Sequence, residues 1–253
     1  MSILEVKNLV KVYGEVNQVK TKALDGLNLN VNNGELIAIM GPSGSGKTTF
    51  LNLISGIDTP SSGEIKISGT SINSMSNEKL AIFRRQKLGF VFQEFNLLDS
   101  LSIRENIMLP MILDKKKVKE INRNTDELIN LFEINDIKNK YPYNVSGGQQ
   151  QRTAVCRALV NQPSIVFADE PTGNLDSKSS KNIMEYFGKM NKERNSTFLV
   201  VTHEPLAASF CNRVVFIKDG QVHMEIVKKH DRKELFERIL DCLAVIGGER
   251  YDI

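Results

Sequence analysis

Residues 41–48 read Gly-Pro-Ser-Gly-Ser-Gly-Lys-Thr, which matches the pattern G-x-x-x-x-G-K-[S/T] at every fixed position. Glycines let the backbone curl until its N–H groups surround phosphates, and a helix N-terminus adds a positive dipole end. Lys47 is the predicted counter-charge for β- and γ-phosphates, and the Thr48 hydroxyl is a predicted Mg²⁺ ligand. A glycine-rich turn is the alternative, but the apolar run 36–40 before the motif and the helical pattern after it favour a phosphate loop.

Two carboxylates end another apolar run, because residues 165–168 are followed directly by Asp169 and Glu170. A buried strand that delivers two acids at its tip suits the Mg²⁺ and the water of a nucleotide site. We expect Asp169 to hold the metal through water and Glu170 to act as general base toward an attacking water. Such a pair is ordinarily a solvated strand end, but the phosphate loop upstream in the same chain favours the catalytic role.

A third candidate is Ser146-Gly147-Gly148-Gln149, which precedes a helical pattern at 150–160. Small residues at the beginning of a helix leave backbone N–H groups exposed, and such groups bind anions. The residues alone favour a simpler role, in which Ser146 caps the helix and the glycines are flexible.

Secondary-structure elements must position the residues of these three motifs. The chain contains short apolar runs rich in β-branched residues, which are typical of strands buried on both faces. The runs are 36–40, 88–92, 165–168, 198–201 and 214–217. Helical patterns fall between several of them, at 47–55, 147–160 and 177–194. This alternation predicts an α/β fold with a mainly parallel sheet and helices on both of its sides.

The remaining segments predict additions to that core within one continuous domain, since no repeat or linker is visible in the 253 residues. Residues 3–12 and 63–69 alternate as antiparallel strands do. Polar helical patterns predict an inserted helical subdomain at about 95–160. The C-terminal stretch of about 214–253 is predicted to be a hairpin that turns at an Asp-Gly pair, followed by a helix.

Composition excludes several functions. Lys and Arg number 33 against 30 Asp and Glu, and the resulting formal charge of +3 creates no strong field toward nucleic acid or a bare membrane. Three cysteines in no C-x-x-C pattern and three scattered histidines predict neither a disulfide framework nor a metal cluster. The apolar runs fall short of the roughly 20 residues of a membrane helix, so a membrane role is expected to require a partner.

Together the phosphate loop, residues 146–149 and the run Asp-Glu-Pro-Thr-Gly-Asn-Leu-Asp at 169–176 resemble the ATP-binding subunit of an ABC transporter. The resemblance covers almost the whole chain. It implies a P-loop NTPase with a RecA-like parallel-sheet core, an antiparallel β subdomain and an inserted α-helical subdomain. It implies ATP and Mg²⁺ as ligands, with ATP bound by Tyr13, Gly41, Pro42, Ser43, Gly44, Ser45, Gly46, Lys47, Thr48 and Thr49.

The same resemblance implies roles for four isolated residues. Tyr13 corresponds to the aromatic residue that stacks on adenine. Gln93 corresponds to the glutamine that touches Mg²⁺ and the water, so the metal is expected at Thr48, Gln93 and Asp169. His203 corresponds to the histidine that contacts the γ-phosphate, and it joins Glu170 and Gln93 as the implied catalytic residues. Asp176 corresponds to the aspartate that communicates between two sites of a dimer.

In this family two subunits are expected to pair head to tail, so that residues 146–149 of one cap the γ-phosphate bound by the other. Loss of that phosphate then removes the charge that the second helix binds. The chain departs from the usual pattern at Val145, where leucine is usual, and at Asn174, where alanine is commonest. Because Glu170 remains a glutamate, the resemblance implies a homodimer with two hydrolytic sites.

A finer resemblance concerns the transported molecule. Residues 88–98 and 104–110 resemble the branch of macrolide exporters, lipoprotein-release ATPases and peptide-antibiotic exporters. The bacitracin-exporter subgroup is matched most closely at 96–101, 176–179, 207–214 and 245–251. This implies export of, or resistance to, antimicrobial peptides such as bacitracin. It also implies a subunit on the cytoplasmic face of the cell membrane that energises a separate integral permease, with a sensor kinase reached through that permease.

Other functions remain open at this stage. One is an ABC ATPase that regulates cell-wall hydrolysis or lipoprotein release through a membrane partner. Another is an ABC ATPase that acts on ribosomes or DNA, which the single nucleotide domain and the lack of a long coiled coil disfavour, so no nucleic-acid partner is expected. A P-loop kinase would leave residues 146–149 without a role. Residues 93–110 are a candidate docking surface for a permease helix, with an ordinary helical-subdomain core as the alternative.

Overall fold

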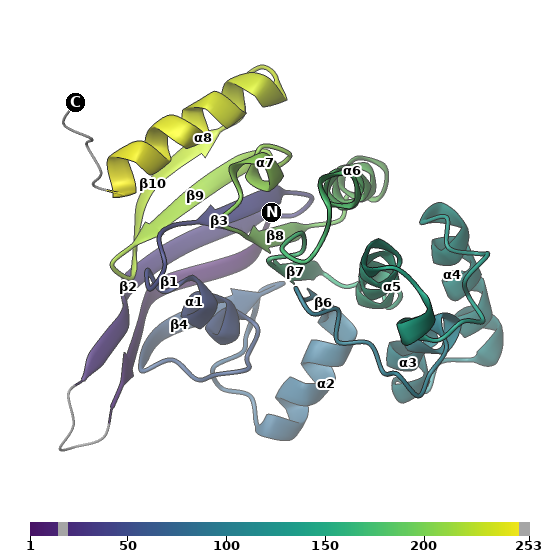
Figure 1. The fold of residues 1–253 in the computed structure, drawn as a ribbon. Helices are drawn as coiled ribbons and strands as arrows, with labels where there is room; N and C mark the ends of the chain where they lie inside the picture. The colour runs from purple at the N-terminus through teal and green to yellow at the C-terminus, as the bar shows by residue number, and fades with distance from the viewer. Residues whose placement is uncertain (15–19, 248–253) are drawn as a thin grey trace.

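The computed structural model describes residues 1–14 and 20–247, which form two sheets and a set of helices (Figure 1). One sheet has six strands in the order β10-β9-β3-β8-β7-β6, and the other has four in the order β2-β1-β4-β5. The strands are β1 (Ser2–Tyr13), β2 (Thr21–Asn32), β3 (Leu36–Met40), β4 (Ser62–Ile67), β5 (Thr70–Ser71), β6 (Leu88–Val91), β7 (Ile165–Asp169), β8 (Phe198–Val201), β9 (Arg213–Lys218) and β10 (Gln221–Val227). The helices are α1 (Lys47–Ile54), α2 (Asn77–Lys87), α3 (Ile103–Leu113), α4 (Val118–Leu131), α5 (Gly147–Leu159), α6 (Ser177–Arg194), α7 (Pro205–Ala208) and α8 (Arg232–Gly247), with a short 3₁₀ turn at Pro142–Asn144.

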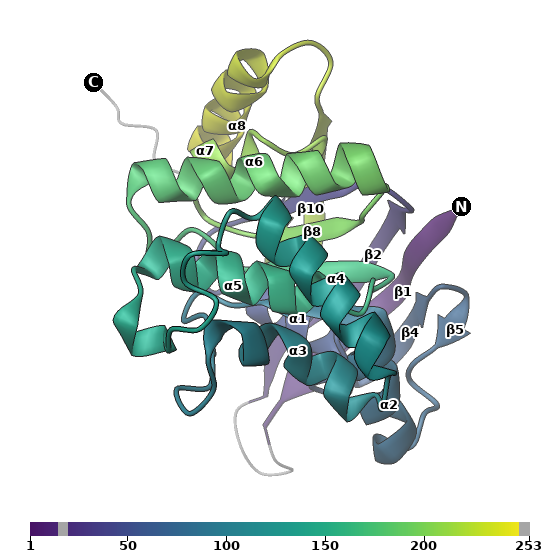
Figure 2. The ribbon, with the colours of Figure 1, turned by 90° about the vertical axis from the view of Figure 1, so that its right-hand side faces the viewer.

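The six-stranded sheet is parallel except at its edge strand β10. Its central strands β3, β7, β8 and β9 are buried on both faces, whereas β10 is largely exposed. Strand β3 shows why its sequence is apolar at every position. Leu36, Ala38 and Met40 belong to the hydrophobic core that includes residues of α3 to α6. Ile37 and Ile39 belong to the core on the other face, which includes residues of α1 and of the antiparallel sheet. Successive side chains point to opposite faces, so a strand covered on both faces has no place for a polar alternation. Helices α3 to α6 lie together on one side of the sheet (Figure 2).

The five predicted strands of the parallel core are confirmed to within one or two residues. The segments predicted from antiparallel alternation also pair with each other, since Leu4 lies opposite Ile67 in the β1–β4 register. The predicted hairpin joins β9 to β10, and both turn residues, Asp219 and Gly220, have positive φ values of 50° and 74°. Positive φ at both central residues is the conformation that Asp-Gly favours in a two-residue turn.

Among the longer elements, strand β2 and helix α2 were not predicted from the sequence. Strand β2 was missed because register shifts break its pairing with β1, so its buried leucines do not follow a strict alternation. Helix α2 was missed because none of its eleven residues is buried, so it carries no apolar stripe. Both elements flank residues that line the functional site or the surface around it.

The predicted C-terminal helix is α8. Its Leu235 and Ile239 side chains are buried, whereas Leu240 is 43% exposed. Residues 248–253, which include the end of the segment resembling bacitracin exporters, lie outside the described residues. Within the described ranges, no helix combines the length and the apolar character required to cross a membrane.

Candidate functional site

The register of the parallel strands brings the ends of four strands to one edge of the sheet. Val201 of β8 lies opposite both Ile39 of β3 and Asp169 of β7, and Ala168 of β7 lies opposite Val91 of β6. The loops that follow these strands therefore start side by side. They carry the phosphate loop, Glu170, His203 and Gln93, and ligands of open α/β sheets bind at this carboxyl edge.

The phosphate loop has the backbone that its glycines predict. Gly41, Gly44 and Gly46 have φ values of 151°, 77° and 103°, which L side chains rarely adopt. A Cβ atom on Gly41 would also lie 2.1 Å from the carbonyl oxygen of Ile217 in β9. The loop thus approaches the neighbouring strand closely before α1 begins at Lys47.

The chemistry of this loop fits a phosphate group. The Lys47 ammonium donates hydrogen bonds to the carbonyl oxygens of Gly41 and Pro42 at 2.8 and 2.9 Å. Burial lowers its pKa, while the carboxylates of Glu170 and Asp169 act in the opposite direction. The Ser45 hydroxyl is buried and has no hydrogen-bond partner among the described residues. A partly desolvated cation, an orphaned hydroxyl and a helix N-terminus are together complementary to phosphate oxygens.

Asp169 lies at the tip of β7, where its surroundings oppose a lone negative charge. Burial and the neighbouring Glu170 carboxylate raise the pKa of Asp169, and Lys47 acts in the opposite direction. The described residues contain no group of three or more His, Cys, Asp or Glu side chains that could enclose a metal. A site with one carboxylate and one hydroxyl, Thr48, suits Mg²⁺, which takes few protein ligands and completes its shell with water and substrate phosphates.

Glu170 is held by the tip of the neighbouring strand. Its Oε1 lies 2.8 Å from Nδ1 of His203, and its Oε2 accepts a hydrogen bond from the His203 backbone N–H at 3.4 Å. The backbone of Glu170 has a positive φ of 45°, and its N–H donates to the Val201 carbonyl oxygen at 2.9 Å. Positive φ in a residue other than glycine costs conformational energy and marks a position that the surrounding structure constrains. Glu170 and His203, two of the three residues predicted to be catalytic, are therefore in direct contact.

Gln93 is joined to Asn174, the position at which the chain departs from the usual alanine. The Gln93 side-chain amide donates to Oδ1 of Asn174, and the Asn174 amide donates to the Gln93 carbonyl oxygen, both at 3.2 Å. An alanine would make neither bond. A Cβ atom on Gly173 would lie 2.9 Å from Nε2 of Gln93, so this glycine admits the contact. Asn174 thus ties the segment that follows β6 and carries Gln93, here called the glutamine loop, to the loop that follows Glu170.

Gln151 of α5 was not among the predicted site residues, although it supports two of them. Its side chain is buried, and Nε2 donates to the carbonyl oxygens of Phe92 at 3.3 Å and Pro171 at 2.5 Å. Phe92 precedes Gln93, and Pro171 follows Glu170. In the sequence Gln151 is one polar residue within a helical pattern, and neither its burial nor its partners can be read from that pattern.

Replacing Gln151 by leucine, which has a similar volume, should leave the Pro171 carbonyl oxygen without its donor and the Phe92 carbonyl oxygen with only the Phe95 N–H at 3.3 Å. We expect a lower melting temperature and a loss of ATP hydrolysis of about tenfold, with ATP affinity changed much less, because each unsatisfied buried group costs roughly 1–3 kcal/mol. Thermal unfolding and steady-state phosphate release measure the two effects. Gln150→Leu, one residue away on the half-buried surface, is the control. Full hydrolysis by a stable Gln151→Leu variant would contradict the positioning role.

The segment 146–149 begins α5 with a capping box. The Ser146 hydroxyl accepts from the Gln149 N–H at 3.4 Å, and the Gln149 side chain accepts from the Ser146 N–H at 3.0 Å. Ser146 is therefore the helix cap that the residues alone predicted. Cβ atoms at Gly147 and Gly148 would lie 3.5 Å from the Phe95 ring and 2.7 Å from the Ser179 hydroxyl. Within the residues described, no hydrogen bond joins this segment to the phosphate loop of the same chain.

Asp176 caps a second helix. Its carboxylate accepts from the N–H groups of Lys178 and Ser179 at 2.9 Å each and from the Ser179 hydroxyl at 2.7 Å. The Ser179 hydroxyl bond and these backbone bonds hold the pKa of Asp176 below its ordinary value. This cap accounts for an aspartate here, and a role between two subunits stays a prediction.

Tyr13 ends β1 and is 41% exposed. Its hydroxyl donates to Oδ2 of Asp58 at 2.8 Å, and the Lys11 ammonium lies 4.7 Å from the centre of its ring. Lys11 also donates to Oδ1 of Asp58 at 2.7 Å. Asp58 thus orients the tyrosine ring. The sequence did not indicate that Asp58 is a partner of Tyr13.

The Tyr13 ring, and not its hydroxyl, should supply nucleotide affinity. Tyr13→Phe should bind ATP within a few-fold of the unmodified chain, whereas Tyr13→Ala should bind about tenfold more weakly, because stacking on a base contributes roughly 1–3 kcal/mol. Titration with a fluorescent ATP analogue measures both variants. Equal affinities for the two variants would remove Tyr13 from the ATP-binding residues.

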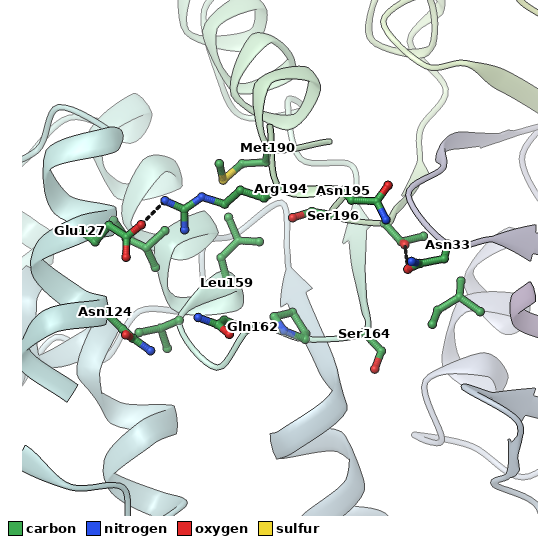
Figure 3. Close-up of a pocket in the computed structure, with 15 residues that line it drawn as sticks. Asn33, Asn124, Glu127, Leu159, Gln162, Ser164, Met190, Arg194, Asn195 and Ser196 are labelled. Atoms are coloured by element: carbon green, nitrogen blue, oxygen red, sulfur yellow. Dashed lines mark hydrogen bonds and ion pairs between the residues drawn. The ribbon is translucent and has the colours of Figure 1, made fainter. Parts of the chain in front are cut away.

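A separate hollow of about 390 Å³ is lined by residues that precede β7 and β8 and by the ends of α5 and α6. Figure 3 shows it, with Arg194 of α6 paired to Glu127 of α4 across one side. It contains none of the predicted site residues, and these lie at the opposite ends of the strands. The candidate site is therefore the loop cluster at the carboxyl edge and not this hollow.

Comparison with known proteins agrees with that geometry. Residues 24–173 match the family model described as ABC transporter. The chain is 49% identical over its whole length to the uncharacterized ABC transporter ATP-binding protein YvcR of Bacillus subtilis, covering 98% of that protein. It is 44% identical to the bacitracin export ATP-binding protein BceA of Halalkalibacterium halodurans, with both chains covered completely. A solved structure of the ATP-binding cassette MJ0796 from Methanocaldococcus jannaschii, a post-hydrolysis dimer with ADP and Pi, is 40% identical with a TM-score of 0.81, over 90% of this chain and 99% of that one.

Proposed function

The chain belongs to the ABC transporter family and is an ATP-binding subunit that hydrolyses ATP, and on this premise we propose that it energises a separate integral membrane permease. We propose that residues 1–253 form a single ATPase domain on the cytoplasmic face of the cell membrane. The observation that carries the proposal is the convergence of Lys47, Glu170, His203 and Gln93 at one sheet edge.

Each residue at this edge would act on bound ATP in a distinct way. Lys47 would bind the β- and γ-phosphates, and Glu170 would accept a proton from the attacking water. The His203 contact orients the Glu170 carboxylate, and His203 would contact the γ-phosphate. Thr48, Gln93 and Asp169 would hold Mg²⁺, which would neutralise charge on the phosphate oxygens.

The second copy of the chain would complete the site. Residues 146–149 lie at the N-terminus of α5. Within the described residues, they make no hydrogen bond to the phosphate loop of their own chain. We propose that they cap the γ-phosphate in a head-to-tail homodimer, with Asp176 near the boundary between the two sites. The dimeric state of the related cassette MJ0796 supports this assembly.

The proposed cargo is an antimicrobial peptide such as bacitracin, which the permease would export or against which it would confer resistance. The identity of 44% to a bacitracin export ATP-binding protein, over the full length of both chains, supports this choice. A sensor kinase is proposed as a further partner through the permease.

The permease would dock in a groove beside the glutamine loop. This groove overlaps residues 93–110, the candidate docking surface in the sequence. The groove has a volume of about 570 Å³ and lies between α2, β6, α3 and α5. Its apolar lining includes Phe90, Phe92, Leu109 and Leu113. An amphipathic helix that fills such a groove would contact the segment leading to Gln93.

Removal of this protein from its host tests the proposal. We expect increased sensitivity to bacitracin, restored by the unmodified chain but not by Glu170→Gln, and recovery of one integral membrane protein with the tagged chain from solubilised membranes. Unchanged bacitracin sensitivity together with defective lipoprotein release or altered cell-wall hydrolysis would favour those alternatives. Recovery of no membrane protein would contradict the permease-coupled function itself.

A further inference from the structure

The position of His203 depends on its neighbours in the chain more than on its own packing. Its side chain is 69% exposed, and among the described residues its ring forms a hydrogen-bonding contact with Glu170 at 2.8 Å. An exposed side chain has few packed atoms around it to fix its place. The anchors of the residues on either side of His203 therefore decide where its ring lies.

The residue before His203 is anchored to the sheet. Thr202 is fully buried, and its N–H donates to the Ile39 carbonyl oxygen at 3.1 Å. Its hydroxyl also accepts a hydrogen bond from the Glu204 N–H at 3.0 Å. This anchor fixes the segment relative to β3, the strand that leads into the phosphate loop.

The residue after His203 is anchored to the loop of the general base. The Thr172 hydroxyl donates to Oε2 of Glu204 at 2.7 Å, and Thr172 is only 1% exposed. Thr172 lies two residues after Glu170, in the loop between β7 and α6. In the described part of the chain, this is the one hydrogen bond between residues 170–176 and 202–208 that Glu170 itself does not make.

A local capping role does not account for the Glu204 carboxylate. Glu204 occupies the N-cap position of α7, where a side-chain oxygen ordinarily accepts a hydrogen bond from the first helical turn, but its side chain forms no such bond. The carboxylate is directed to Thr172 instead. A hydroxyl that donates to a carboxylate forms a charge-assisted bond, which is stronger than a bond between neutral groups.

We infer that Glu204 is a positioning residue for ATP hydrolysis, which acts through Thr172 to keep the Glu170 carboxylate and the His203 ring in contact. The inference rests on the proposed function, because it concerns the same general base. Two adjacent contacts join the loops after β7 and β8, and the one made by Glu204 holds the other in place. Its loss lets the two loops separate and leaves the phosphate loop unchanged.

Removal of either partner should slow hydrolysis without weakening ATP binding. Glu204→Ala and Thr172→Val should each hydrolyse ATP about tenfold more slowly, because a displaced base loses part of the roughly 10²–10⁴ that general-base catalysis supplies. Their ATP affinity should stay within about twofold of the unmodified chain, because neither residue belongs to the phosphate loop. The double variant should be no slower than either single variant, since both substitutions break one contact. Phosphate release and titration with a fluorescent ATP analogue measure these quantities.

Conservative variants separate positioning from a general loss of stability. Thr172→Ser keeps the hydroxyl and should recover most of the rate, and Glu204→Gln keeps an acceptor without the charge and should have an intermediate rate. Glu237→Ala is the matched control, because Glu237 lies on the exposed surface of α8 and pairs with Lys233. Thermal unfolding shows that each variant is folded at the temperature of the assay.

The His203 ring reports the contact directly. The chain has three histidines, so the ring signal of His203 in labelled protein can be assigned by its loss in His203→Ala. Glu170→Gln changes the group beside the ring and should move this signal. Glu204→Ala and Thr172→Val should also move it, whereas Thr172→Ser should not. A role in stability alone would leave the signal in place.

Three results would overturn the inference. They are hydrolysis by Glu204→Ala within about twofold of the unmodified chain, losses that multiply in the double variant, and a His203 signal that stays in place while hydrolysis falls. Each leaves the proposed function standing, because Glu170→Gln is measured in the same assays. Full turnover by Glu170→Gln would instead contradict the general-base role on which the inference rests.

Discussion

We expect Glu170→Gln to bind ATP with nearly unchanged affinity, to hydrolyse it at least about a hundredfold more slowly and to accumulate as an ATP-bound dimer. General-base catalysis typically contributes about 10²–10⁴ in rate, and an amide cannot accept the proton of the attacking water. The amide keeps the size of the carboxylate, and it offers both a donor and an acceptor to Nδ1 of His203, which lies 2.8 Å from Oε1 of Glu170. Binding and hydrolysis should therefore separate in this variant.

Three measurements check this result: phosphate release, titration with a fluorescent ATP analogue, and gel filtration with and without ATP. Glu185→Gln is the charge-matched control, because Glu185 lies on the exposed face of α6, where its one ion pair among the described residues is with Lys181. Turnover within about threefold of the unmodified chain would remove Glu170 from the general-base role. Slow turnover without ATP-dependent pairing would contradict the dimeric site.

Lys47→Ala should lose nucleotide binding itself. Its ammonium is the cation of the phosphate loop, and charge-assisted hydrogen bonds contribute roughly 1.5–3 kcal/mol each, so we expect ATP affinity to fall by at least about tenfold. The loop should remain folded, since the glycine conformations and the hydrogen bond from the Phe50 N–H to the Gly46 carbonyl oxygen do not involve this side chain.

The same fluorescent titration measures Lys47→Ala, with Lys22→Ala as the control for loss of an exposed ammonium. Lys22 pairs with Asp25 on the surface of β2. Lys47→Ala should also abolish ATP-dependent pairing, which is the opposite of the result expected for Glu170→Gln. Unchanged ATP affinity in Lys47→Ala would contradict the assignment of residues 41–48 as the phosphate-binding site.

The parallel core could be read from the sequence because each of its strands contains a continuous apolar run, with charged residues only at strand ends such as Asp169, Arg213 and Lys218. Strand β7, for example, is buried from Ile165 to Ala168, and burial on both faces leaves a signal that needs no knowledge of neighbours. The phosphate loop was equally readable, since its glycines are required by the conformation of their own backbone. Helix α2 left no comparable signal, because a helix without buried residues has no apolar stripe.

Sequence alone determined which residue types this protein has for phosphate chemistry: the loop with Lys47, the acids Asp169 and Glu170, and the segment 146–149. These are local patterns, in which the chemistry and the backbone requirement lie within a few consecutive residues. Only the tertiary structure decided which distant groups hold them, such as Gln151 between Phe92 and Pro171, Asn174 against Gln93, and Arg157 on the Phe95 carbonyl. Those contacts depend on strand order and register, which place residues tens of positions apart within hydrogen-bonding distance and leave no periodic trace in the chain.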